Sequence, residues 1–461
     1  MLVESAADAD HEEEEHQMRT LPPAVATAVH VATLARKAGK PIPPKVYAVL
    51  EAAANPWPAE WLLAPLPGDP IRVVELFAGP GGWSEGIAAV LGVAVDSCGV
   101  DISPDACATA RAAGHRRICA DITTLDPEHI ALRYTAAVII SPPCPTFSPA
   151  GKLSGLEARN IDILCTAIAY VGEAAGFLPV DEIFDFHDED DYDEDGNCPC
   201  EPGEGCMAPF APRSGATWDE VREMAAEVSD PRIALMLEVV IWPLALQAAG
   251  APIRWMAMEQ SHNLPEDILD YLSGEFRCAE WFYTSHDIME AADYGLPSRR
   301  KRVYMVATRT YTPAITRRIR PLPATSMAQA LGWQPGERVN TRGTRPIDPK
   351  TGRPKGGNCF SADGPSWCLT GKSRTWKRES DGLRLTESEA GLLVGFRRSY
   401  PWQGSRTSAF QQAADVVSPV MAAIVLSGMF GALGEALVRD YLAQLYEMDD
   451  MLAQDDYDLV T

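Results

Sequence analysis

The stretch VVELFAGPGG, Val73 to Gly82, decides the fold of this chain. Its apolar half is typical of a buried strand. Its glycine-rich half is typical of a turn that precedes a helix and lets the backbone approach a ligand closely. Strand-like apolar runs recur at 95–100 and 136–140, with helical patterns between them at 83–92 and 103–113. This alternation predicts an α/β protein with a doubly wound, mostly parallel sheet.

Two acidic residues follow the next strands. Asp101 ends the second predicted strand, nineteen residues after Gly82, and Asp121 follows a third candidate strand. A carboxylate at such a strand end commonly binds the ribose hydroxyls of a nucleoside cofactor. Each acid could equally be an ordinary helix N-cap. Together with the glycine turn, the two acids favour a nucleoside-cofactor pocket.

The segment SPPCPTFS, Ser141 to Ser148, places Cys144 directly after the apolar run 136–140. Proline fixes its own φ and restricts the residue before it, so the three prolines leave this loop little freedom. A thiol held rigidly at the carboxyl end of a strand is suited to nucleophilic attack. A buried structural thiol is the alternative interpretation.

Charged residues accompany two further predicted strands, at 254–259 and 303–307. Glu259 ends a very apolar run, where a carboxylate is costly unless it is paired or used, so it is either a proton donor or a cap. Arg300 and Arg302 alternate and therefore point to one face of their strand. Two guanidinium groups on one face suit a phosphate or a polar ring, although charge guarding an exposed strand edge gives the same pattern.

The net charge of −24 hides an uneven distribution. Seven acids and no base lie in residues 1–15, and twelve acids and no base lie in 181–205. Residues 295–380 instead carry eighteen Lys and Arg against four acids, a local net of +14. A basic region of that size favours a nucleic-acid partner, because binding requires neutralisation of phosphates. A solvated basic face is the simpler alternative.

Composition along the chain predicts a core with interruptions. We expect these parts: an acidic, helical N-terminal extension (1–70), a Rossmann-like core (71–153 and 232–309), an acidic insertion (154–231), a small irregular module (310–382), completion of the core (383–435) and an acidic tail (436–461).

Three cysteines of the insertion, Cys198, Cys200 and Cys206, lie near His187 and raise the question of zinc. Their spacing matches no standard zinc finger, and the surrounding carboxylates would attract many cations, so we predict no metal site. The eleven cysteines are scattered, and the acidic N-terminus lacks the features of a signal peptide. No apolar run approaches the length of a membrane span. We therefore expect a cytoplasmic protein without membrane contact, and favour a monomer.

Taken in order, these segments resemble the DNA (cytosine-5) methyltransferase family. The resemblance lies in ELFAGPGG for the first cofactor motif, SPPCPTFS for the Pro-Cys loop, MEQ for Glu-Asn-Val, GLPSRRKRVYMV for Gln-x-Arg-x-Arg, RLTESEAGLLVGFRRSYPW for the ninth motif and QAADVVSP for the last motif. It covers 71–153 and 232–435, and the segments NTRGTR and GPSWCLTGKSRTW resemble those of phage-borne members. The family keeps its target-recognition domain where this chain has 310–382.

The resemblance implies roles for individual residues. Cys144 would be the nucleophile, Glu259 the acid that engages the cytosine ring, and Arg300 and Arg302 the residues that orient the base and its phosphate. The implied S-adenosylmethionine site consists of Phe77, Ala78, Gly79, Gly81, Gly82, Asp101, Ile102, Asp121, Ile122, Pro143, Asp415 and Val416.

Three departures from the family pattern accompany the resemblance. Gln260 replaces the usual Asn and Ser298 the usual Gln, and both changes are expected to be tolerated. Ala414 and Asp415 replace Gly-Asn in the last motif, which puts a carboxylate near the amino-acid end of the cofactor. That carboxylate could weaken cofactor binding or contact the ammonium group.

The resemblance implies an enzyme that methylates carbon 5 of a flipped-out cytosine in double-stranded DNA, with S-adenosylmethionine as methyl donor and a covalent Cys144 adduct. Two alternatives stay open at this point. One is a catalytically degenerate relative that binds DNA or a partner, and the other is an RNA cytosine-5 methyltransferase.

Overall fold

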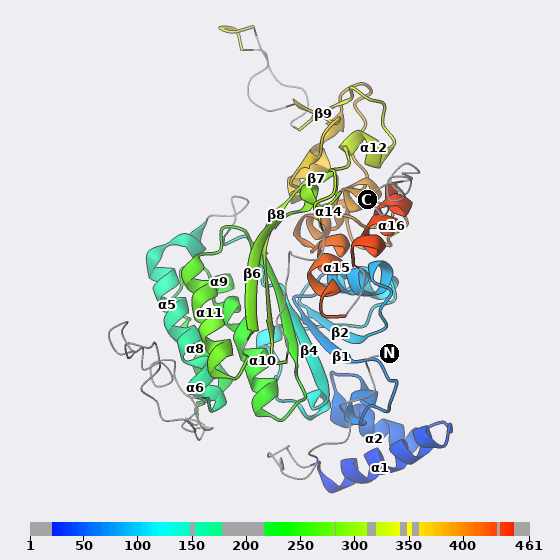
Figure 1. Cartoon of the computed structure of the whole chain (residues 1–461), viewed down its shortest axis with the longest axis vertical. Helices are drawn as coiled ribbons and strands as arrows, with labels where there is room; N and C mark the ends of the chain where they lie inside the picture. The colour runs from blue at the N-terminus through cyan, green and yellow to red at the C-terminus, as the bar shows by residue number, and fades with distance from the viewer. Residues whose placement is uncertain are drawn as a thin grey trace, which may run out of the picture.

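The computed structural model describes residues 21–147, 153–177, 216–281, 283–310, 320–341, 348–352, 359–430 and 434–446. A central sheet lies between two layers of helices (Figure 1). The N-terminal helices lie at one end of the molecule, and a small β-containing module lies at the other.

The central sheet has seven strands in the order β3-β2-β1-β4-β5-β8-β6. Their bounds are β1 Arg72–Leu76, β2 Asp96–Asp101, β3 Arg117–Cys119, β4 Thr135–Ile140, β5 Trp255–Ser261, β6 Tyr283–Glu290 and β8 Lys301–Thr308. Strand β8 runs antiparallel to both of its neighbours, and the other pairs are parallel. The predicted α/β fold with a mostly parallel sheet is therefore confirmed. The polar edge strand β6 has no clear apolar alternation and was not predicted.

Successive side chains of each strand enter opposite cores, as strand geometry requires. Val138 and Ile140 of β4 belong to one buried cluster, and Ala137 and Ile139 belong to the other. The first cluster is covered by α1 Pro23–Lys37, α2 Pro44–Ala54, α5 Ala158–Ala169, α6 Val171–Ala175, α8 Trp218–Met224, α9 Pro231–Ala234, α10 Glu238–Ala248 and α11 Glu266–Cys278. The second is covered by α3 Gly82–Glu85, α12 Met327–Leu331, α13 Glu387–Leu393, α14 Arg406–Asp415, α15 Pro419–Ser427 and α16 Gly434–Tyr446.

Two predicted helices lie close to their expected positions. Helix α4, Pro104–Ala112, follows β2 and begins at Ser103, whose side chain accepts a hydrogen bond from the Ala106 amide. The helix expected at 83–92 starts as α3 and continues as a π-helical turn over Gly86–Val90.

The boundaries expected for the acidic insertion are wrong at both flanks. Leu164 and Ile168 of α5 and Val221 of α8 are fully buried in the first core cluster. The acidic composition belongs to the middle of the region, whereas its ends are amphipathic helices that bury apolar faces. Within the insertion, residues 178–215, which contain the candidate zinc ligands, lie outside the described part of the chain.

The acidic tail expected at 436–461 begins as a helix, as its sequence predicts, but this helix belongs to the core. Helix α16 packs into the second core cluster through Val438 and Leu442. Tyr441 donates a hydrogen bond to the Gly395 carbonyl at 3.0 Å, and Tyr446 donates one to the Leu392 carbonyl at 2.8 Å. Residues 434–446 therefore complete the core rather than trail from it.

The N-terminal helices are likewise joined to the core. Trp57 packs edge-on against Trp242 of α10 at 6.0 Å between ring centroids. The guanidinium of Arg72, at the start of β1, donates to the carbonyls of Trp61 and Leu63 at 2.6 and 2.7 Å. This region contributes to stability, because it covers one end of the sheet.

The module between β8 and α13 contains a three-stranded antiparallel sheet in the order β10-β9-β12. Its strands are β9 Arg338–Asn340, β10 Cys359–Ser361 and β12 Lys377–Arg378, and a further short strand, β11 Ser366–Trp367, pairs with β7 Ser298–Arg299. Phe360 packs against Trp367 and Trp376 at 4.7 and 5.3 Å between ring centroids. The module therefore has its own aromatic centre.

Two helical stretches, 231–248 and 406–427, are long and apolar enough by composition to cross a membrane. The sequence had not suggested such stretches, because each is built from shorter apolar runs. In the structure 72% of the first and 89% of the second is buried within the protein, as is usual for core helices.

Candidate active site

A cavity of about 1000 Å³ opens at the carboxyl ends of the parallel strands. Nucleoside ligands of open α/β sheets bind at this edge. The cavity is lined by eleven of the twelve predicted cofactor residues: Phe77, Ala78, Gly79, Gly82, Asp101, Ile102, Asp121, Ile122, Pro143, Asp415 and Val416. Gly81 does not line it. Cys144 and Glu259 also line the cavity, whereas Arg300 and Arg302 do not.

The glycine turn after β1 has an unusual backbone. Phe77, Gly79 and Gly81 have φ values of 54°, 52° and 113°, in the left-handed region. A Cβ on Gly82 would lie 1.9 Å from the carbonyl oxygen of Val417, so only glycine lets α3 approach the turn between α14 and α15. The sequence motif is therefore needed for close packing as well as for an open ligand surface.

The two acids at the strand ends are both bonded to backbone amides. Asp101 Oδ2 accepts from the Gly79 amide and Oδ1 from the Ser103 amide, each at 2.8 Å. Asp121 Oδ1 accepts from the Thr123 amide and hydroxyl at 3.0 and 2.9 Å. The alternative reading as a helix cap thus holds for Asp121, while both carboxylates keep lone pairs directed at the cavity.

The Pro-Cys loop is fixed to the end of β5. The Gln260 side chain donates to the Pro142 carbonyl at 3.1 Å, and the Ser261 hydroxyl donates to the Phe147 carbonyl at 3.0 Å. On the other side, Trp83 Nε1 donates to Ser141 Oγ at 2.9 Å. Gln260 therefore performs a structural task with its amide, and these bonds hold the half-buried Cys144 at the cavity surface.

Burial raises the pKa of the Cys144 thiol, although the guanidinium of Arg302 acts in the opposite direction. Glu259 raises this pKa further, and Arg300 lowers it. The arginines alone do not make Cys144 a thiolate in the resting protein, because loss of hydration outweighs their charge.

Glu259, Arg300 and Arg302 meet beside Cys144. Strand β8 runs antiparallel to β5, so its first residues lie at the carboxyl edge of the sheet, where Arg302 pairs with Ser261. Arg302 Nε lies 2.9 Å and Arg300 Nη2 lies 3.8 Å from Glu259 Oε1. All three side chains are at least 90% buried, so this cluster is shielded from solvent.

The guanidinium of Arg300 is bound to the protein's own backbone, and its expected role in orienting the base or a phosphate stays a prediction. Its guanidinium donates to the carbonyls of Ala414 at 2.5 Å, Asp415 at 3.3 Å and Val416 at 2.9 Å. Arg300 therefore fixes the end of α14, which forms part of the cavity wall. Its planar group has several donors directed at backbone carbonyls rather than at a ligand.

Asp415 faces the cavity with an exposed side chain, and Gln411 Nε2 donates to Oδ2 at 2.6 Å. The surrounding protein raises the pKa of this carboxyl through partial desolvation, opposed by the bond from Gln411 and by Arg300. The departure from Gly-Asn thus leaves the backbone of this turn held by Arg300, and places an acidic group at the cavity mouth.

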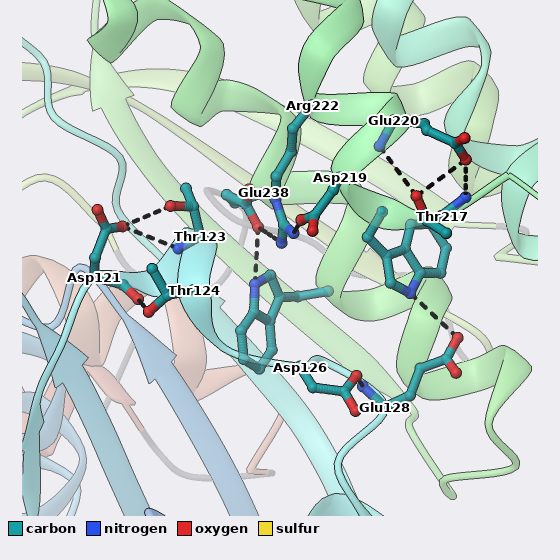
Figure 2. Close-up of polar contacts among 12 residues, drawn as sticks. Asp121, Thr123, Thr124, Asp126, Glu128, Thr217, Asp219, Glu220, Arg222 and Glu238 are labelled. Atoms are coloured by element: carbon teal, nitrogen blue, oxygen red, sulfur yellow. Dashed lines mark hydrogen bonds and ion pairs between the residues drawn. The ribbon is translucent and has the colours of Figure 1, made fainter.

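A second wall of the cavity comes from helices that the sequence analysis missed. Asp219 and Arg222 of α8 and Glu238 of α10 line it, beside the turn that carries Asp121 and Thr123 (Figure 2). Arg222 Nε and Nη2 bind the two oxygens of Glu238 at 2.7 and 3.0 Å, and Nη1 lies 3.1 Å from Asp219 Oδ1. Trp242 Nε1 also donates to Glu238 at 2.9 Å. Glu238 stands within an otherwise apolar run before Trp242, and this isolated acid was the sequence signal that could have pointed to a buried ion pair.

Among the described residues, no group of three or more His, Cys, Asp or Glu side chains is arranged to hold a metal ion.

Comparisons with known proteins give one family match and several similar solved structures. The family model described as C-5 cytosine-specific DNA methylase matches residues 71–175. No curated protein matches the chain in sequence.

Similar solved structures include the Entamoeba histolytica methyltransferase EhMeth, at 14% identity and a TM-score of 0.49, covering 79% of this chain and 98% of that chain. A putative DNA modification methyltransferase encoded within an E. coli prophage is 15% identical, with a TM-score of 0.43, and covers 79% of this chain and 100% of that chain. The S. pombe Dnmt2 methyltransferase is 14% identical, with a TM-score of 0.49, and the match covers 77% of this chain and 97% of that chain.

The fold is a Rossmann-like α/β fold with a mostly parallel central sheet. The match of residues 71–175 to the C-5 cytosine-specific DNA methylase model agrees, for this part of the chain, with the resemblance found in the sequence.

Proposed function

We propose that this protein methylates carbon 5 of cytosine in double-stranded DNA and uses S-adenosylmethionine as the methyl donor. The observation that carries the proposal is the convergence of Cys144 and Glu259 on one cavity, with Arg302 paired to Glu259 at 2.9 Å. A degenerate binding protein would have no need to keep a nucleophile, an acid and its guanidinium partner together.

The cavity suits S-adenosylmethionine in shape and charge. Ile102 is 69% exposed at the end of β2, so it offers an apolar surface to a purine ring. Asp101 and Asp121 would accept hydrogen bonds from the ribose and the adenine, and the glycine turn would lie against the amino-acid end. Asp415 would attract the ammonium group. When bound, the cofactor would supply an electrophilic methyl group.

The protein's own groups account for activation of the cytosine ring. Cys144 Sγ would form a bond to carbon 6, which removes the aromaticity and makes carbon 5 a nucleophile. Glu259 would protonate or hydrogen-bond ring nitrogen 3, where negative charge develops. Arg302 would hold the Glu259 carboxyl in place. Once carbon 5 carries the methyl group, loss of its proton to a base re-forms the double bond and breaks the bond to Cys144.

The substrate must present an unstacked base, because carbon 6 of a paired cytosine is inaccessible within the duplex. The module between β8 and α13 carries much of the positive charge of 295–380, which favours a phosphate-rich partner. We propose that the enzyme binds duplex DNA through this module and works as a cytoplasmic monomer.

Bisulfite sequencing of plasmid DNA from cells that express the chain tests the proposal, with Cys144→Ala as the control. We expect cytosine-5 methylation at one short motif, and none with the variant. Purified enzyme should also transfer a labelled methyl group to duplex DNA in preference to transfer RNA. Transfer of the methyl group to RNA alone would mean that the substrate is RNA rather than duplex DNA. Absence of transfer to either, from folded protein, would favour the degenerate alternative.

A further inference from the structure

The glycine turn of the cofactor cavity is held by a tyrosine that lies more than three hundred residues later in the chain. Tyr400 donates its hydroxyl proton to the Pro80 carbonyl at 2.5 Å, and this bond is buried. Arg117 Nε, at the start of β3, donates to the neighbouring Gly79 carbonyl at 3.4 Å. Both carbonyls belong to the segment with left-handed backbone, which by itself has more than one accessible conformation.

Tyr400 is itself rigidly placed. Its ring packs against Phe396 and Trp402 at 4.5 and 5.1 Å between centroids. A Cβ on Gly81 would lie 2.9 Å from the Tyr400 hydroxyl, so the tyrosine and the turn are in close contact. Burial raises the pKa of Tyr400, so its hydroxyl stays protonated and remains a donor.

The segment that follows Tyr400 is bonded to the next wall of the cavity. The Gln403 amide donates to Thr109 Oγ1 of α4 at 2.9 Å. Thr109 Oγ1 in turn donates to Gln412 Oε1 at 2.7 Å, and Gln412 Nε2 donates to the Gln403 carbonyl at 2.9 Å. Residues 400–412 are therefore connected to the glycine turn and to the helix that follows Asp101.

We propose that Tyr400 is a positioning residue for cofactor binding: its hydroxyl fixes the Gly79–Gly82 turn in the conformation that receives the amino-acid end of S-adenosylmethionine. The proposal rests on the methyltransferase function proposed above. It assigns a task to Tyr400, which lies in the segment that resembles the ninth motif of the family. Tyr400 acts through the Pro80 carbonyl and does not touch the cytosine.

The variant Tyr400→Phe tests this assignment, because it keeps the packed ring and removes one hydroxyl. S-adenosylmethionine binding is measured by calorimetry without DNA, and KM and kcat are measured with DNA. We expect affinity for the cofactor to fall about tenfold, which corresponds to the net contribution of one buried hydrogen bond. At saturating cofactor, kcat should stay within about threefold of the wild type, and the KM for DNA should not change.

Tyr446→Phe is the matched control. It removes a hydroxyl that donates to the Leu392 carbonyl at 2.8 Å, also from a buried tyrosine, but this hydroxyl makes no hydrogen bond to the glycine turn. Both variants should lower the melting temperature to a similar degree, whereas only Tyr400→Phe should weaken cofactor binding. Equal effects of the two variants on cofactor affinity, or none from either, would overturn the positioning role. Wild-type protein that does not bind the cofactor would instead refute the proposed function.

Discussion

The cofactor cavity has two walls of different origin. One wall consists of the carboxyl ends of β1, β2, β3, β4 and β5 with the loops that follow them, and its residues belong to motifs that are recognisable in the sequence. The other consists of helices α8 and α10, whose cavity residues are scattered among ordinary helical patterns. The first wall carries the reactive groups Cys144 and Glu259, and the second carries a buried ion pair. We therefore expect the first wall to determine chemistry and the second to determine stability.

The largest effect is expected at the reactive wall. Glu259→Gln keeps the size of the side chain and removes its proton and charge, so kcat should fall roughly 10²–10⁴-fold. Binding of S-adenosylmethionine, measured by calorimetry, should change little, because Glu259 lies on the cytosine side of the cavity. Retention of wild-type kcat would exclude Glu259 as the acid that engages the ring.

The ion pair of the helical wall should affect stability more than chemistry. Arg222→Gln leaves Glu238 buried with Trp242 as a remaining donor, and should lower the free energy of unfolding by about 3 kcal/mol. Urea denaturation measures this change. The matched control is Arg159→Gln, because Arg159 and Glu227 form a 3.0 Å pair with side chains 74% and 77% exposed. That substitution should cost less than about 1 kcal/mol. Similar losses for both variants would mean that the helical wall has no special stability.

The smallest effect is expected at Asp415, at the end of α14. Asp415→Asn removes a carboxylate from the cavity mouth and restores the residue usual in the family. If the carboxylate attracts the ammonium group of the cofactor, affinity should fall about threefold, as for a partly exposed ion pair. Calorimetry at low and high salt measures it, and the difference should shrink as salt rises. Tighter binding by the variant would show that Asp415 impairs the site.

Much of the fold could be predicted from local patterns. The apolar runs before Gly79, Asp101 and Cys144 are strands because they are buried on both sides, and such strands need no alternation. Strand β6 was missed because it lies at the sheet edge, where half-exposed polar residues such as His286 and Asp287 obscure the period. The flanks of the insertion were misassigned because average acidity hid the apolar faces of α5 and α8.

The candidate site also contains residues that the sequence predicts and residues that it does not. Cys144 and Glu259 are recognisable because a reactive group at the end of an apolar strand is unusual in itself. The motif also marks Arg300, but its task was not predictable, because donation to the carbonyls of 414–416 depends on where α14 ends in space. Tyr400 and Arg222 carry no sequence signal of function.

The sequence by itself determined the resemblance to a family, the parallel sheet and the residues at its carboxyl edge, because these depend on short motifs and on the burial of single strands. Only the tertiary structure decided which distant groups hold those motifs in place. Tyr400 reaches Pro80 and Arg222 reaches Glu238 through packing of separate elements. Such contacts follow from the positions of whole helices and loops, and no local pattern of residues encodes them.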